Sequence, residues 1–338
     1  MALLRSDKIA LDRREDVMTA GCRQPNRNVG GLSMWFGPQD LEAQLDDEIL
    51  RRHLAKRLTV PLAGEPVRIV QSDDKGHLIL MAASWQDLSL SLVKVLYERP
   101  ENKMRGNGTP VLNGSVSIYR HDGEVIAVAD GATFTGLRTA AIAALATEWL
   151  SMSNTCHCII GAGFEAYYHA KALARLKGVK TMRLWNRTPK AAYALQEKLC
   201  SLPQFSHLSV RVHEVIEEAL VDADVITTVT SSPEPLFNAQ MIKKTVLINA
   251  MGAYLPHTRE LSSDIVAQAT LYADFLPACL QEAGDYLIPA AEGLLDLTRV
   301  RPLARAAHDG PMPGITVMKS VGSAVFDLAC AECLVMSK

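Results

Sequence analysis

The stretch CHCIIGAGFEAYYHAKALARLKG, residues 156–178, decides the fold of this chain. An apolar, strand-like run leads into a glycine loop, and an alanine-rich helical pattern follows. The loop matches the pattern G-x-G-x-x-A/G through Gly161, Ala162, Gly163, Phe164, Glu165 and Ala166. Gly161 permits the tight turn, Gly163 lets backbone N–H groups approach a pyrophosphate, and Ala166 keeps the helix close to the strand. In this strand–loop–helix context the motif predicts dinucleotide binding.

The end of the next strand indicates which dinucleotide is bound. The run 181–185 is strand-like, and Asn186, Arg187 and Thr188 follow it where NAD-selective sites usually hold an acidic residue. A carboxylate would repel a 2′-phosphate, whereas a guanidinium and a hydroxyl can bind one. The sequence therefore favours NADP(H) over NAD(H). The alternative is that Arg187 is a solvated turn residue.

Downstream of the glycine loop, strand and helix patterns alternate. Short apolar strands are expected at 210–212, 224–229, 246–250 and 270–273, with a helix at 215–220. This alternation predicts an α/β fold with a Rossmann-type doubly wound parallel sheet, in a domain spanning 131–314. The long alanine-rich segment 132–151 predicts the helix that joins it to a second domain.

The N-terminal half predicts a smaller α+β domain. Residues 1–34 read as an arm without clear periodicity, and the pattern after Pro38 predicts one amphipathic helix. Short β-prone runs then fill residues 60–130, with a hairpin turn at His121-Asp122-Gly123, so a small, mostly antiparallel sheet is expected there. The tail 315–338 is expected to return to this domain, completing a unit of 1–130 plus 315–338.

Composition excludes several classes of function. The 338 residues include 35 Lys and Arg against 37 Asp and Glu, a net charge of −2, so neither nucleic acid nor a membrane surface is an expected partner. Among the seven cysteines, Cys330 and Cys333 form a lone CxxC in an apolar helical pattern, which favours buried packing thiols; the nine histidines show no metal-ligand spacing, and no metal site is expected. The opening residues lack a signal-peptide core, and a reduced cytoplasmic protein is predicted.

Segments spread over most of the chain resemble the ornithine cyclodeaminase/mu-crystallin family in the same order. They are GLRTAA at 136–141, GAGFEA at 161–166, VITTVTSS at 225–232, NAMGA at 249–253 and KSVG at 319–322. The resemblance implies a homodimer in which a Rossmann domain is inserted into a substrate-binding and dimerisation domain. It also implies further cofactor contacts at Thr230, Ser231, Met251, Gly252, Lys319, Val321 and Gly322.

The same resemblance implies that Arg68, Lys94 and Arg138 surround the α-carboxylate of the substrate beside the nicotinamide. The chemistry is reasonable on its own terms, since guanidinium groups grip carboxylates and a buried lysine can give a proton to nitrogen. Lys94 lies in the apolar run 90–96, where an unpaired ammonium would be costly. For Arg68, a surface charge at a strand edge is the alternative.

Departures from the family pattern predict the reaction. Cyclodeaminases carry carboxylates at positions where this chain has Tyr254, the run 78–81 and Lys319, so cyclisation of ornithine is not expected. The resemblance instead implies an NADPH-dependent reductase of a 2-imino acid, such as pyrroline- or piperideine-2-carboxylate, or a reversible amino-acid dehydrogenase. The alternatives are a reductive amine-joining enzyme, a cyclodeaminase and a non-catalytic, crystallin-like binding protein. The role of Tyr254 stays open.

Overall fold

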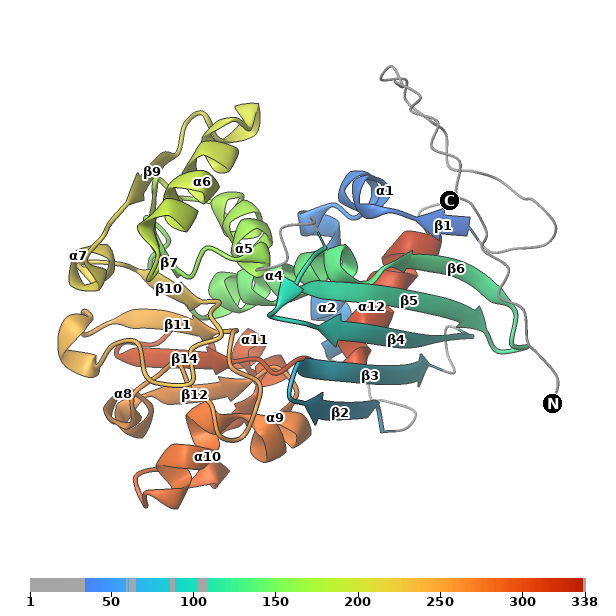
Figure 1. Ribbon diagram of the computed structural model, residues 1–338. Helices are drawn as coiled ribbons and strands as arrows, with labels where there is room; N and C mark the ends of the chain where they lie inside the picture. The colour runs from blue at the N-terminus through green and yellow to red at the C-terminus, as the bar shows by residue number, and fades with distance from the viewer. Residues whose placement is uncertain (1–33, 59, 61–64, 86–88, 103–108, 337–338) are drawn as a thin grey trace, which may run out of the picture.

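The computed structural model describes residues 34–58, 60, 65–85, 89–102 and 109–336. Two sheets with their helices lie side by side, and the helix α4 (Gly131–Leu150) runs between them (Figure 1). The expected arm 1–34 falls outside the described residues except for its last one, Met34. No helix within the described ranges is long and apolar enough to cross a membrane.

The larger sheet has eight strands in the order β13-β12-β14-β11-β10-β7-β8-β9, and each pair is parallel. Its strands are β7 (Cys156–Ile160), β8 (Thr181–Trp185), β9 (Ser209–Val212), β10 (Val225–Thr228), β11 (Val246–Ala250), β12 (Thr270–Ala273), β13 (Arg301–Pro302) and β14 (Ile315–Lys319). Central strands such as β10, β11 and β14 are buried along their whole length, as sheets covered on both faces require. The predicted doubly wound parallel sheet is confirmed.

Helices connect these strands. They are α5 (Phe164–Ala174), α6 (Pro189–Cys200), α7 (Ile216–Leu220), α8 (Ser263–Gln268), α9 (Leu276–Glu282), α10 (Gly284–Ala291) and α11 (Ala306–Asp309). Short 3₁₀ helices occupy Pro203–Phe205, Ala239–Met241, Leu297–Arg299 and Leu303–Arg305.

The smaller sheet has six strands in the order β1-β6-β5-β4-β3-β2. They are β1 (Met34–Phe36), β2 (Val67–Asp73), β3 (Gly76–Trp85), β4 (Leu90–Glu98), β5 (Leu112–Arg120) and β6 (Val125–Asp130). The pairs from β2 to β6 are antiparallel, and the hairpin predicted around Asp122 joins β5 to β6. The sequence did not predict β1, which pairs in parallel with β6.

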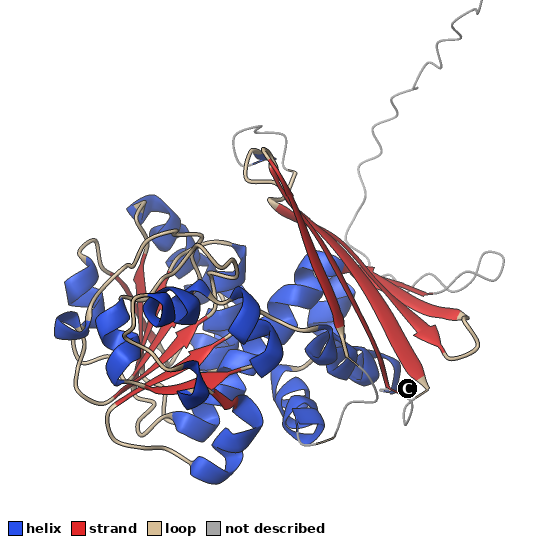
Figure 2. Cartoon of the chain, turned by 90° about the horizontal axis from the view of Figure 1, so that it is seen from below, coloured by secondary structure: helices blue, strands red, loops and turns tan. Residues whose placement is uncertain are grey.

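One face of the six-stranded sheet is packed with helices, and no described helix covers the opposite face (Figure 2). The covering helices include α2 (Asp47–Leu58), α4 and α12 (Ala324–Met336). The single helix expected after Pro38 is in fact α1 (Pro38–Gln44) followed by α2, because the backbone leaves the helical region at Leu45. Strand β4 shows the alternation directly, with Leu92, Lys94 and Leu96 buried and Val93 and Tyr97 exposed.

The C-terminal segment contributes to both halves of the molecule. As expected, α12 packs against β3 and β4 of the smaller sheet. Strand β14, which was expected to return with it, instead pairs with β11 and β12 in the middle of the parallel sheet. The predicted boundary at residue 315 therefore differs from the structure by one strand, since a strand that is buried along its whole length, as β14 is, fits best between two neighbouring strands of a covered parallel sheet.

Candidate active site

A buried cluster of charges forms where β4, α4 and α12 meet. The Lys94 ammonium lies 2.6 Å from Oδ2 of Asp327, and Nε of Arg138 donates to Oδ1 of the same carboxylate at 2.9 Å. Lys94 and Asp327 have no exposed surface, and Arg138 is 4% exposed. One carboxylate thus faces two cations, and the cluster carries a net positive charge inside the protein.

Burial and neighbouring charges set the protonation of this cluster. Burial lowers the pKa of Lys94 to about 8, although the Asp327 carboxylate opposes that shift. For Asp327, burial favours the neutral acid, but Lys94 and Arg138 outweigh it and hold the pKa below its usual range. The Lys94 ammonium is therefore protonated at neutral pH and loses its proton only slightly above it, and Asp327 stays ionised.

Arg68 lies on the same face of the sheet as Lys94. The strand register places Arg68 opposite Met81 and Met81 opposite Lys94. The Cα atoms of the two cationic residues are therefore two strand spacings apart, roughly 10 Å. Arg68 is not a free surface charge, because its Nε donates to Glu282 of α9 at 2.7 Å. This ion pair joins the six-stranded sheet to a helix of the parallel-sheet domain.

The glycine loop has the geometry that its sequence predicts. Gly161 has a φ of +111°, and a Cβ there would lie 2.7 Å from the carbonyl oxygen of Val229, so only glycine fits. Gly163 immediately precedes α5, and a Cβ added to it would meet nothing within 4 Å. Ala166 is fully buried against the sheet. The space beside Gly163, directly before α5, is therefore free of neighbouring atoms.

The other loop residues have separate positions. Phe164 is exposed, and a hollow of about 300 Å³ beside the loop is lined in part by Ala162, Gly163 and Phe164. Glu165 is partly buried, with its Oε2 3.9 Å from Nδ1 of His169. Burial raises the pKa of Glu165 to about 7, against the opposing influence of Arg138 and Lys94. The charged cluster and the glycine loop are therefore close enough to interact electrostatically.

The predicted selectivity residues lie at the end of β8. The side-chain oxygen of Asn186 accepts a hydrogen bond from the backbone N–H of Ala162 at 3.1 Å, and its Nδ2 donates to the carbonyl of Thr188 at 3.0 Å. Asn186 thus links the glycine loop to the turn before α6. Arg187 and Thr188 are exposed on that turn.

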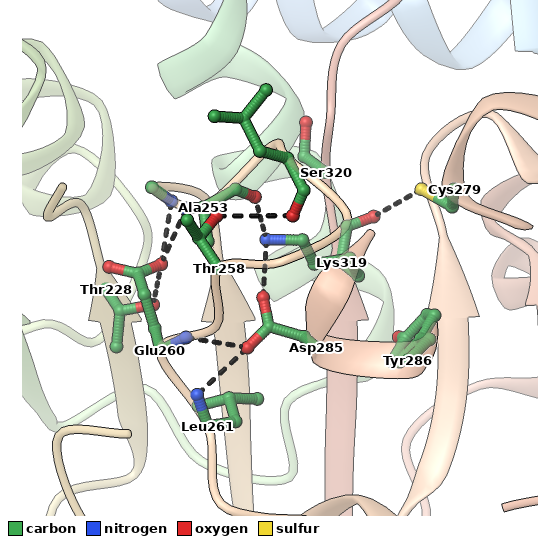
Figure 3. Close-up of polar contacts among 12 residues, drawn as sticks. Thr228, Ala253, Thr258, Glu260, Leu261, Cys279, Asp285, Tyr286, Lys319 and Ser320 are labelled. Atoms are coloured by element: carbon green, nitrogen blue, oxygen red, sulfur yellow. Dashed lines mark hydrogen bonds and ion pairs between the residues drawn. The ribbon is translucent and has the colours of Figure 1, made fainter. Parts of the chain in front are cut away.

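A second buried network supports the loops that follow β10 and β11 (Figure 3). The Glu260 carboxylate accepts hydrogen bonds from the backbone N–H groups of Thr230 and Gly252, both at 2.8 Å. It also accepts one from the hydroxyl of Thr228 at 2.7 Å. The loop at Gly252 lies close against the loop at Thr230. A Cβ added to Gly252 would lie only 2.1 Å from the carbonyl oxygen of Thr230, so no larger residue fits there. One carboxylate therefore holds together the two loops at the carboxyl edge of the sheet.

Lys319 belongs to this network rather than to an open surface. Its ammonium lies 2.8 Å from the Asp285 carboxylate and donates to the carbonyl of Ala253 at 2.5 Å (Figure 3). Asp285 in turn accepts from the backbone N–H groups of Glu260 and Leu261. Burial favours a neutral Lys319, but Asp285 and Glu260 outweigh it and raise the pKa. The Lys319 side chain, predicted to contact the cofactor, is directed into the protein interior.

The remaining predicted cofactor residues line the same edge. Ser231 is exposed, Met251 is half-buried and donates its N–H to the carbonyl of Thr228 at 2.9 Å, and Val321 is buried. Gly322 has a φ of +82°, and a Cβ there would lie 2.8 Å from the Arg138 guanidinium. The loop after β14 therefore packs directly on the charged cluster. We call the loops after β10, β11 and β14, which carry the predicted cofactor residues, the cofactor-side loops; the last of them lies against Arg138.

Sequence reasoning missed Asp327, Glu260 and Asp285. Each is an acidic residue that is buried in the structure, at 0% exposure. Asp327 gave a signal that could have been used, because it is an acidic residue in an otherwise apolar stretch, VFDLACA. A charge in such a position needs a buried partner.

Comparison with known proteins gives consistent matches. A model of the ornithine cyclodeaminase/mu-crystallin family matches residues 51–336. The ketimine reductase mu-crystallin of Rattus norvegicus is 36% identical over 274 residues, which cover 79% of this chain and 83% of that protein. A Delta(1)-pyrroline-2-carboxylate reductase of Bacillus cereus is 30% identical over 298 residues, covering 84% and 88%.

A solved structure is similar over nearly the whole fold. It is that of Thermococcus litoralis Delta(1)-pyrroline-2-carboxylate reductase in complex with NADH and L-proline. The two structures superpose with a TM-score of 0.80 at 25% identity, covering 88% of this chain and 95% of the other.

Proposed function

The chain belongs to the ornithine cyclodeaminase/mu-crystallin family, and on this premise we propose that it is an NAD(P)H-dependent reductase of 2-imino acids. Its substrates are cyclic ketimines such as pyrroline- or piperideine-2-carboxylate, and the reverse reaction is the dehydrogenation of an amino acid. The similarity to ketimine and pyrroline-2-carboxylate reductases supports this activity. The observation that carries the proposal is the buried Lys94–Asp327–Arg138 cluster beside the cofactor-side loops.

The cluster accounts for binding of an acid group. Two cations and one carboxylate leave one positive charge in a buried place, and a substrate carboxylate would neutralise it. Arg138 offers guanidinium N–H groups beyond the one that bonds Asp327, and Arg68 lies on the same sheet face as a further donor. We assign Arg68, Lys94 and Arg138 to the carboxylate, with Asp327 positioning the last two.

Lys94 is also the group that we assign as the donor of a proton to the imine nitrogen. An imine carbon accepts hydride much better once its nitrogen is protonated, so the site needs an acid that holds its proton near neutral pH. A lysine with a pKa of about 8 meets this requirement. The Asp327 carboxylate fixes the ammonium in place, and the buried surroundings keep water from taking the proton.

The chain fits a dinucleotide at the glycine loop. Gly161 makes the turn, and Gly163 leaves open space before the N-terminus of α5, where a pyrophosphate binds in such folds. We assign the nicotinamide half to the strand-end residues Thr230, Ser231, Met251, Gly252, Val321 and Gly322. Lys319 supports that surface through Ala253. When bound, the reduced nicotinamide supplies the hydride.

We further propose that NADPH is preferred, on the basis of Arg187. Replacing Arg187 by Ala should raise KM for NADPH roughly 10- to 100-fold, because hydrogen bonds to charged groups contribute about 1.5–3 kcal/mol. KM for NADH should change by less than about twofold, since NADH has no 2′-phosphate for the guanidinium to bind. Steady-state kinetics with both cofactors measures this, and an equal change for the two would show that Arg187 is only a turn residue.

The activity is tested by following NADPH oxidation at 340 nm with a panel of imines. We expect turnover of 1-pyrroline- and 1-piperideine-2-carboxylate, with L-proline and L-pipecolate as the products. The panel also contains 2-oxo acids paired with amino acids, and L-ornithine with NADP⁺. Activity on oxo acid–amine pairs alone would indicate an amine-joining enzyme, proline from ornithine a cyclodeaminase, and no turnover with retained NADPH binding a binding protein.

We also propose that the chain forms a homodimer through the helix-free face of the six-stranded sheet. Val67, Ile69, Val93 and Tyr97 are each at least 40% exposed on this face, an apolar surface of the kind that subunit interfaces bury. Replacing Ile69 by Asp should shift the sedimentation coefficient from dimer to monomer. Replacing Val221, which is 52% exposed on the parallel-sheet domain, by Asp is the control and should leave the dimer intact. A wild-type monomer would refute the assignment.

A further inference from the structure

Tyr254 reaches across the two halves of the molecule. It follows β11 in the loop that begins at Met251, yet its hydroxyl donates to the carboxylate of Glu98, at the end of β4 in the other sheet. Its ring meets the ring of His77 edge-on, with centroids 6.0 Å apart. The Arg68 guanidinium lies 5.8 Å from the centre of the same ring. Tyr254 therefore contacts strands β2, β3 and β4 at once.

The strand register locates this contact relative to the cationic cluster. Lys94 and Glu98 are four residues apart on β4, so both side chains point to the same face. Their Cα atoms are roughly 13 Å apart. His77 lies directly opposite Glu98. A surface thus runs from a cationic end at Lys94 and Arg68 to an acidic end at Glu98.

Tyr254 occupies the space between these two ends. Its side chain packs against the small apolar cluster that contains Ile79, Met81, Leu96 and Ala324. Ile79 and Leu96 lie in the row of residues between Lys94 and Glu98. The ring therefore covers the apolar middle of the surface, while the hydroxyl occupies the acidic end.

We propose that Tyr254 determines the length and charge preference of the substrate pocket by closing it at Glu98. This proposal rests on the proposed imine reductase activity and narrows the class of imino acid that the enzyme accepts. With Tyr254 in place, the pocket takes short or cyclic imino acids without a distal charge. The hydrogen bond from Tyr254 satisfies the Glu98 carboxylate, which would otherwise attract a distal cation. Burial and the nearby Glu98 carboxylate both raise the pKa of Tyr254, so the hydroxyl keeps its proton and remains a donor.

The test compares a neutral and a cationic substrate of similar length. The pair is 2-oxooctanoate, whose side chain is uncharged, and 5-guanidino-2-oxopentanoate, each supplied with ammonium to form the imine, and 1-piperideine-2-carboxylate is the reference. Wild type should favour the neutral imine. In Tyr254→Ala, the ratio of kcat/KM for the cationic over the neutral imine should rise at least tenfold, because a guanidinium–carboxylate contact then becomes available. In Tyr254→Ala/Glu98→Gln the ratio should fall back to within about threefold of wild type.

The double variant makes the inference specific. A ratio unchanged in Tyr254→Ala, or raised equally with and without the Glu98 carboxylate, would overturn it. If Tyr254→Ala does not fold, Tyr254→Leu gives the same comparison, since leucine still packs on Ile79 and Leu96 but cannot bond Glu98. Failure of wild type to reduce any imine, the reference included, would instead refute the proposed function.

Discussion

Replacing Lys94 by Met should lower kcat/KM for 1-piperideine-2-carboxylate by about 10³-fold or more. General acid catalysis accounts for roughly 10²–10⁴-fold, and the variant also removes one of the cations that we assign to the substrate carboxylate. Met has a similar length and no charge, so Asp327 and Arg138 remain as a neutral pair. The dissociation constant for NADPH should change by less than about twofold, because the glycine loop is not altered. Stopped-flow reduction and fluorescence titration of NADPH measure the two effects.

The pH profile separates the proton-donating role from a structural one. Because the pKa of Lys94 is lowered to about 8, the residue is protonated below that pH and loses its proton above it. For wild type, kcat/KM should therefore be flat up to pH 8 and fall about tenfold per pH unit beyond it. This decline is counted after the effect of the substrate's own ionisation on the rate has been subtracted. Lys94→Met should lack this decline. A rate near that of wild type, or an identical pH profile in the variant, would remove Lys94 from the mechanism.

Replacing Lys319 by Met should destabilise the protein by about 3–5 kcal/mol, since breaking a buried ion pair leaves an uncompensated charge. The charge left behind is Asp285, which is fully buried beside Glu260. The Ala253 carbonyl also loses its donor, which loosens the loop leading to Tyr254. Differential scanning calorimetry should show a fall in melting temperature of roughly 5–15 °C.

Two controls test whether the buried charge is the cause. Arg52→Met removes the exposed ion pair with Glu48, whose side chains are 71% and 62% accessible, and should change stability by less than about 0.5 kcal/mol. Lys319→Met/Asp285→Leu removes both buried charges and should recover much of the lost stability. If Lys319→Met melted at the same temperature as Arg52→Met, the network around Glu260 would not stabilise the fold.

The geometry of the glycine loop was predictable because it depends on local sequence. The tight turn at Gly161, the open approach at Gly163 and the close packing at Ala166 all depend on residues a few positions apart. The alternation of apolar strands and helices likewise gave β7, β8, β10 and β11 nearly to the residue. Short-range spacing in the chain is enough to determine such features.

Only the tertiary structure decided how distant residues pair. Asp327 meets Arg138 across 189 positions, and Tyr254 meets Glu98 across 156. Neither contact leaves a periodic trace in the sequence, because it depends on how α12 and the loop after β11 pack onto another sheet. The direction of the Lys319 side chain has the same origin, since a buried ammonium turns to whichever carboxylate the fold brings near it, here Asp285. The sequence alone therefore determined that a Rossmann-type fold is present, and three-dimensional packing decided which charged side chains lie together.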